Sequence, residues 1–196
     1  TTRELHYFTL FENQWKSVSE WPPEGFSASR FYFQPQGVLA GDASAPQTAD
    51  GFEVDFATST GSNNRWQTEL DQRPIRYAPI QAPLSYTSAP LTADTEITGY
   101  PIVTIWATST HDDGAFFVYL EALDETGTAH YLTEGMLRAL HRKISDEKPP
   151  YKQFVPYHSF KRKDAQPLIP GQPADLTFGL HPISALVRRG WRLLVS

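Results

Sequence analysis

The fold is decided by residues 84–142, which read LSYTSAPLTADTEITGYPIVTIWATSTHDDGAFFVYLEALDETGTAHYLTEGMLRALHR. Two runs within this stretch, residues 101–108 and 115–123, alternate their side chains with the two-residue period of a β-strand. Both faces of the first run are largely apolar, so we predict a central strand that is covered on both sides, with Trp106 in the core. The turn-forming residues 124–127 (DETG) then lead into a return strand, which predicts a hairpin.

Short strands are predicted on both sides of this stretch as well. Sixteen prolines and twelve glycines interrupt the 196-residue chain, which disfavours long helices. Residues 135–142 fit either a short helix or a strand, and the β context favours the strand. Residues 182–189 are predicted to form one helical turn that Gly190 ends. About ten short strands without helical alternation predict an all-β fold, a single two-sheet β-sandwich of the jelly-roll kind over residues 1–196.

The composition narrows the range of partners. The net charge of −5 argues against binding to a nucleic acid backbone, and no apolar run is long enough to span a bilayer. The chain has no cysteine, which excludes disulfides, thiolate metal sites and a cysteine nucleophile. We therefore expect no nucleic acid partner and no membrane partner. For the compartment, the bacterial cytoplasm is favoured and secretion is the alternative.

No motif in the sequence predicts a catalytic or metal site. There is no G-x-S-x-G nucleophile elbow and no Gly-rich phosphate loop. The six histidines do not pair at metal-ligand spacing, and residues 111–114 (HDDG) fit a strand-connecting turn better than a calcium site. A Ser/His/Asp triad assembled from distant positions is the open alternative. We predict no catalytic residue, no metal and no cofactor in this chain.

The tryptophans are the side chains best suited to meet a ligand or a neighbouring domain. Trp15 and Trp21 flank a loop, where they suit a sugar platform or an interface anchor. Trp66 follows the polar loop GSNNR, and loops of this kind often carry function. Packing beneath the loop is the alternative for each of the three.

An ordered series of motifs resembles the C-terminal domain of the Xaa-Pro dipeptidyl-peptidase and cocaine-esterase (CocE/NonD) serine hydrolases. The motifs are residues 87–99, 113–127 and 132–142, with further matches at residues 11–15, 21–23, 71–74 and 190–193. In the last of these, Trp191 stands where the family usually has His. The resemblance covers nearly the whole chain.

This resemblance implies a non-catalytic domain of a larger enzyme. Members of the family carry an α/β-hydrolase domain with a Ser/Asp/His triad, a helical cap domain, and a C-terminal jelly roll of the galactose-binding-like kind that helps to wall the substrate cleft. It thus implies hydrolase and cap domains of the same polypeptide as partners, and no hydrolysis by this chain alone. A homo-oligomer stays open. The chain stops at Ser196 within an apolar run, so we also expect the sequence to be truncated.

The resemblance places one loop near the cleft. Residues 58–67 match the family region that approaches the substrate, so Asn63, Asn64, Arg65 and Trp66 are the predicted cleft or ligand contacts. A carbohydrate-binding module is the alternative function, because these four side chains offer an aromatic platform beside polar groups. A purely structural interaction module is the third reading.

Overall fold

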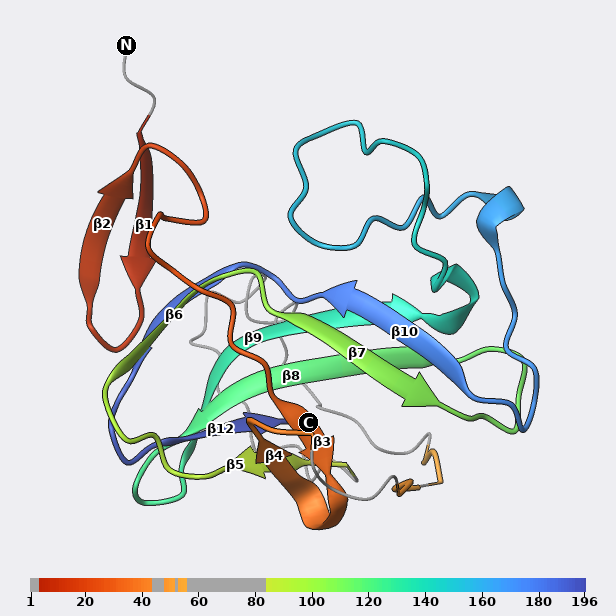
Figure 1. Cartoon of the computed structure of the whole chain (residues 1–196), viewed down its shortest axis with the longest axis horizontal. Helices are drawn as coiled ribbons and strands as arrows, with labels where there is room; N and C mark the ends of the chain where they lie inside the picture. The colour runs from red at the N-terminus through yellow and green to blue at the C-terminus, as the bar shows by residue number, and fades with distance from the viewer. Residues whose placement is uncertain (1–3, 44–47, 52, 56–83) are drawn as a thin grey trace. The chain divides into compact units, whose positions relative to one another are not determined.

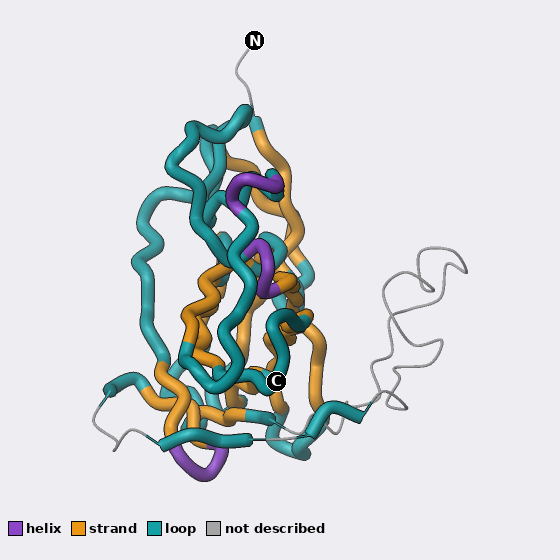
Figure 2. Tube along the Cα trace, turned by 90° about the vertical axis from the view of Figure 1, so that its right-hand side faces the viewer, coloured by secondary structure: helices purple, strands orange, loops and turns teal. Residues whose placement is uncertain are grey.

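The protein is β throughout the part of the chain that the structure describes. The structure is a computed structural model, and it describes residues 4–43, 48–51, 53–55 and 84–196. Within these ranges there are twelve strands, and the helical segments are three 3-10 turns of three residues each (Figure 2). No helix in the same ranges is long and apolar enough to cross a membrane. The predicted all-β sandwich class is confirmed, and the galactose-binding-like jelly roll is consistent with these sheets.

The chain forms two compact units, each assembled from segments that are distant in the sequence. The first unit comprises Thr1–Ser27, Glu96–Tyr119 and Thr133–Val187, and the second comprises Ala28–Thr95, Leu120–Leu132 and Arg188–Ser196. Strands β8 (Ala115–Leu123) and β9 (Ala129–Arg138) contribute residues to both. The single domain expected from the sequence stays a prediction.

Three pairs of strands build the first unit. They are the hairpin of β1 (Leu5–Thr9) with β2 (Gln14–Val18) and the pair of β7 (Ile102–Ala107) with β10 (Ala174–Gly179), both labelled in Figure 1, and the pair of β6 (Thr95–Gly99) with β11 (Ile183–Val187). The core of this unit includes Leu176, Phe178 and Val187, none of which is more than 2% exposed. Burying one such side chain contributes about 1.5–3 kcal/mol, so this apolar face holds the unit together.

Backbone and side-chain hydrogen bonds join the β1–β2 hairpin to β11. The Leu10 N–H donates to the Ser184 carbonyl oxygen, and the Leu186 N–H donates to the Leu10 carbonyl oxygen, both at 2.9 Å. The Thr9 hydroxyl, which is fully buried, bonds the Ser184 hydroxyl at 2.9 Å, and Ser184 in turn bonds the Thr98 hydroxyl at 2.8 Å. Because buried hydroxyl groups need partners, this network fixes the place of the hairpin within the unit.

The prediction that residues 101–108 form a central strand is wrong. β7 pairs with β10 in a two-stranded sheet, and only one face of β7 is covered. Val103 is 8% exposed, whereas Ile102 is 51% exposed and Trp106 is 72% exposed, so the predicted burial of Trp106 is also wrong. The reason is that the alternation of apolar residues defines the two faces of a strand, but it does not show whether the chain itself covers both of them.

The second unit is built on one sheet. Its strand order is β3 (Tyr32–Gln34), β4 (Val38–Ala40), β5 (Tyr86–Ser88), β12 (Arg192–Val195), β8 and β9. β12 pairs antiparallel with both β5 and β8, so the last strand of the chain lies inside the sheet. The turn predicted at residues 124–127 is confirmed, because the Asp124 carboxylate accepts the backbone N–H groups of Thr126 and Thr128 at 2.8 and 2.9 Å. Gly127 completes this turn with a φ of 82°.

Two smaller predictions are corrected or refined. Residues 182–189 are not a helical turn, because β11 occupies most of them and Gly190 only turns the chain afterwards. The strand predicted at residues 135–142 is confirmed as far as Arg138, and Ala139–His141 then form a 3-10 turn. This turn is held where the Leu140 N–H donates to the Asp113 carboxylate at 3.0 Å, so the HDDG segment has a structural role.

Candidate functional site

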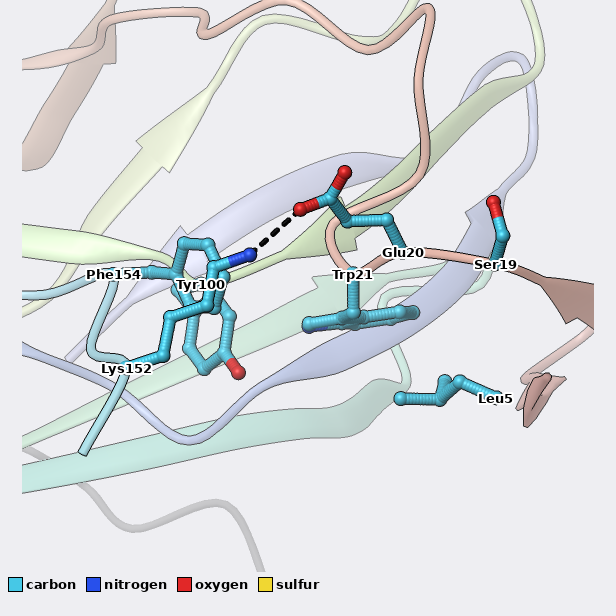
Figure 3. Close-up of a pocket in the computed structure, with 7 residues that line it drawn as sticks. All are labelled: Leu5, Ser19, Glu20, Trp21, Tyr100, Lys152 and Phe154. Atoms are coloured by element: carbon cyan, nitrogen blue, oxygen red, sulfur yellow. Dashed lines mark hydrogen bonds and ion pairs between the residues drawn. The ribbon is translucent and has the colours of Figure 1, made fainter. Parts of the chain in front are cut away.

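The predicted contact residues Asn63, Asn64, Arg65 and Trp66 lie outside the described residues, so their role stays a prediction. Another of the tryptophans that the sequence singled out, Trp21, lies in a hollow of the first unit. This hollow has a volume of about 550 Å³, and Figure 3 shows the residues that line it: Leu5, Ser19, Glu20, Trp21, Tyr100, Lys152 and Phe154.

Four separate stretches of the chain bring these side chains together. Leu5 belongs to β1, residues 19–21 follow β2, Tyr100 lies between β6 and β7, and residues 152 and 154 belong to the long connection before β10. Gly99 turns the chain out of β6 with a φ of 134°, a backbone conformation that favours glycine, and the next residue is Tyr100. The hollow thus depends on tertiary structure and not on any local motif.

Aromatic rings form the floor of the hollow. Tyr100 stacks on Phe154, with 5.2 Å between ring centroids and 17° between ring planes. Trp21 meets Tyr100 edge-on at 6.5 Å and Tyr7 edge-on at 5.0 Å. Such ring pairs contribute about 0.5–1.5 kcal/mol each beyond their buried area, so the rings hold one another as a preformed apolar surface.

The segment that carries Phe154 is held close to the sheet by a glycine. A Cβ atom placed on Gly179 of β10 would lie 2.5 Å from the Val155 Cγ1 atom, which is far inside normal contact. Glycine at this position therefore allows Val155 to approach the backbone of β10. The neighbouring Phe154 is positioned against Tyr100 as a consequence.

A charge pair spans the rim of the hollow. The Lys152 Nζ atom lies 2.7 Å from a Glu20 carboxylate oxygen and 4.9 Å from the centroid of the Phe154 ring (Figure 3). The hydrogen bond from Lys152 holds the pKa of Glu20 below its usual range. Both side chains are more than 60% exposed, at 65% and 63%, so water screens the pair and it adds little stability. A ligand could therefore displace either group at low cost.

The hollow suits binding and not bond cleavage. Among the seven residues that line it, Ser19 carries the only aliphatic hydroxyl, and none is a histidine. An apolar ring floor beside a carboxylate, an ammonium group and a hydroxyl fits the face of a sugar ring or an aromatic group of a ligand. A nucleophile with an adjacent base is missing from this lining, so the hollow does not supply nucleophilic catalysis.

The histidines of the described residues have other roles. His158 is 7% exposed, and its two ring nitrogens face the backbone carbonyl oxygens of Lys143 and Thr177, both at 3.1 Å. His6 bonds the Ser17 hydroxyl at 2.6 Å, but this pair lies on an exposed strand face, whereas a catalytic pair needs a pocket with oxyanion donors. Among the described residues, no group of three or more His, Cys, Asp or Glu side chains could hold a metal ion.

The remaining tryptophans are distributed over both units. In the first unit, Trp15 is 73% exposed on β2. In the second unit, Trp191 stacks on His130 with 5.0 Å between ring centroids and 11° between planes. The residue that departs from the family motif thus has a packing partner of its own. Sequence reasoning identified Trp15 and Trp21 as candidates, but it had no signal for Tyr100 or Phe154.

Known proteins related in sequence are larger than this chain. Residues 1–196 match the family described as the X-Pro dipeptidyl-peptidase C-terminal non-catalytic domain. The chain is 44% identical to putative serine esterases of Mycobacterium bovis and Mycobacterium tuberculosis over 198 residues, which cover 98% of this chain. The chain spans only 31% of the length of these curated relatives.

Solved structures share the fold at low sequence identity. A CocE/NonD family hydrolase from Staphylococcus aureus has a TM-score of 0.64 at 19% identity, covering 96% of this chain and 32% of that chain. An aminopeptidase from a marine sediment Thaumarchaeota archaeon has a TM-score of 0.66 at 16% identity, covering 97% and 32%. An α-amino acid ester hydrolase has a TM-score of 0.65 at 20% identity, covering 97% and 32%. The family resemblance inferred from the sequence motifs is confirmed by the family match over residues 1–196, and the solved structures show the shared fold.

Proposed function

Because this chain belongs to the family of X-Pro dipeptidyl-peptidase C-terminal non-catalytic domains, we propose that it is the accessory domain of a serine hydrolase that cleaves acyl esters or Xaa-Pro peptide bonds. The parent polypeptide would supply the α/β-hydrolase domain, with its Ser/Asp/His triad, and a helical cap domain. This domain would pack on them and help to wall the substrate cleft.

One observation carries the proposal: a family described as non-catalytic and C-terminal matches the whole chain, while the relatives are about three times longer. The side chains of the first unit support it, because its hollow holds binding groups without a nucleophile and base. The relatives are named putative serine esterases, and the solved structures that share the fold include an aminopeptidase and an α-amino acid ester hydrolase. The scissile bond follows from the catalytic domain, which the full-length polypeptide supplies.

We place the contact with substrate at Asn63, Asn64, Arg65 and Trp66, as the family resemblance implies. The experiment replaces Trp66 by Ala in the full-length polypeptide and measures kcat and KM for a small acyl ester and for a bulky one. For the bulky ester, KM should rise or kcat should fall, because a wall of the cleft is lost, and the small ester should be unaffected. Unchanged kinetics for both esters in a folded variant would remove Trp66 from the cleft.

A carbohydrate-binding module is the second candidate function, and the aromatic hollow favours it. Trp21, Tyr100 and Phe154 supply the ring surface, and Glu20 and Lys152 supply polar groups at its rim. Calorimetric titration of the chain with a panel of oligosaccharides tests this function. Millimolar or tighter binding that Trp21→Ala abolishes would support a sugar site. If no oligosaccharide of the panel gives a heat of binding, the carbohydrate-binding function is rejected and the accessory-domain function remains.

A further inference from the structure

We propose that the outward face of the β1–β2 hairpin, formed by His6, Phe8, Trp15 and Ser17, is the surface on which the catalytic domain of the same polypeptide docks. The inference rests on the proposed function and deepens it, because it names the face of this domain that makes the contact. The occupant is a covalently attached domain, which distinguishes this surface from the ligand hollow.

The pairing register separates the two faces of the hairpin. Phe8 lies opposite Trp15, and His6 lies opposite Ser17, so these four side chains share one face. The other face carries Thr9, which is fully buried and bonds into β11. One face of the hairpin therefore belongs to the unit, and the other is left uncovered.

The uncovered face has the composition of an interface. Trp15 is 73% exposed and Phe8 is 36% exposed, and their rings meet edge-on at 5.5 Å between centroids. The hydrogen bond between His6 and Ser17 adds a polar pair beside the rings at 2.6 Å. A two-stranded hairpin is marginally stable in water, and an aromatic residue buries about 150–250 Å² when a partner covers it. A domain that covers this face would thus both hide the rings and stabilise the hairpin.

The direction of the chain identifies the occupant. β1 is the first strand among the described residues (Figure 1), and the matching family is described as a C-terminal domain, so the catalytic domain of the proposed polypeptide precedes β1. Five residues span at most about 18 Å when fully extended. The residue that precedes Thr1 in the full-length polypeptide therefore lies within this distance of Leu5. The hairpin therefore lies within reach of the incoming polypeptide.

A second exposed tryptophan provides a matched comparison. Trp106 on β7 is 72% exposed, nearly the same fraction as Trp15. Its surroundings are more polar, because Asp175 lies opposite it on β10, and the Thr104 hydroxyl beside it bonds the Thr177 hydroxyl at 2.9 Å. β7 also lies in the middle of the sequence, so no polypeptide joins the domain at this strand. We assign docking to the hairpin face and expect the β7 face to remain in solvent.

Thiol accessibility in the full-length polypeptide tests the assignment. Ser17→Cys and Thr104→Cys are well matched, since each replaces an exposed hydroxyl residue that bonds across to a neighbouring strand and neither removes an aromatic ring. The 196 residues contain no cysteine of their own, so peptide mass spectrometry after maleimide labelling reads each position without background from this domain. We expect labelling at position 17 to be at least about tenfold slower than at position 104, because the docked catalytic domain must first separate from the hairpin face. Adding Trp15→Ser to Ser17→Cys should raise the rate at position 17 toward that at position 104.

Each alternative outcome is distinct. Equal rates at the two positions overturn the docking face. Slow labelling at position 104 with fast labelling at position 17 also overturns it. In that case the domain docks through the β7 face, and the proposed accessory function is retained. Protection at position 17 that disappears on dilution indicates a second copy of the chain and overturns it as well. Ester hydrolysis by the same preparations reports separately on the proposed function, and His6→Cys replaces Ser17→Cys if that variant does not fold.

Discussion

Replacing Gly179 by Ala tests how closely the connection that carries Phe154 is packed on β10. The added Cβ atom would lie 2.5 Å from Val155 Cγ1, 2.6 Å from Val155 Cβ and 2.9 Å from Val155 Cγ2. All three distances are inside normal contact, so either the strand or the Val155 segment must move. Overpacking of this kind costs about 1–3 kcal/mol. With about 2–4 °C per kcal/mol for a chain of this size, the midpoint of thermal unfolding should fall by roughly 2–12 °C.

The measurements are thermal unfolding and urea unfolding of the 196-residue chain, with Gly114→Ala as the control. A Cβ atom on Gly114 would meet its nearest atom, Cε2 of Phe116, at 3.8 Å, so the control should be neutral or slightly stabilising. Val155→Ala removes two of the three close atoms at Gly179, so the double variant should be less destabilised than the sum of the single variants by about 0.5–3 kcal/mol. Equal stability of Gly179→Ala and Gly114→Ala, or strict additivity with Val155→Ala, would refute the packing argument.

Three further predictions concern polar groups. Thr9→Val removes the buried hydroxyl bond that joins the hairpin to β11 and should cost about 1 kcal/mol in urea unfolding, whereas an unchanged midpoint would show that this bond adds nothing. The hydrogen bond from Lys143 holds the pKa of Asp164 below its usual range, so its contribution to stability is present above about pH 4 and is lost as the pH falls through the lowered pKa. With Asp164→Asn, the free energy of unfolding should therefore fall less steeply as the pH is lowered through the acid range. The same pH dependence in the variant and the unchanged chain would contradict this. Burial and the hydrogen bond to Asp50 raise the pKa of Tyr86 to about 12. Tyr86→Phe should therefore remove a tyrosine ionisation at high pH from the spectrophotometric titration. Loss of an ionisation near the usual tyrosine pKa would contradict the assignment.

The sequence predicted the elements whose pattern is local. The alternation in residues 115–123 and the turn residues 124–127 predicted β8 and its hairpin, because a strand period and a tight turn are both set by neighbouring residues. The prediction for residues 182–189 failed because Pro182 and Gly190 suggested a helical turn, whereas pairing with β6 and the bonds to Leu10 decide the structure. Long-range pairing leaves no local signal at such a position.

The candidate site was predictable only in part, for a related reason. Trp21 stood out as an aromatic residue beside a loop, but Tyr100 and Phe154 come from segments far along the chain. No spacing in the sequence connects these positions, because the backbone approach at Gly179 brings the last of them into place. Trp106 shows the converse limit, since its apolar strand predicted burial and the structure leaves it exposed.

In the proposed function, this domain serves a hydrolase without taking part in the chemistry. A fluorophosphonate probe, which forms a covalent bond with activated serine nucleophiles, tests it directly. The full-length polypeptide and the 196-residue chain are each treated with the probe, and the labelled serine is located by peptide mass spectrometry. We expect one labelled serine in the full-length polypeptide, outside these 196 residues, and no label on the chain alone. A labelled serine within residues 1–196 would contradict it.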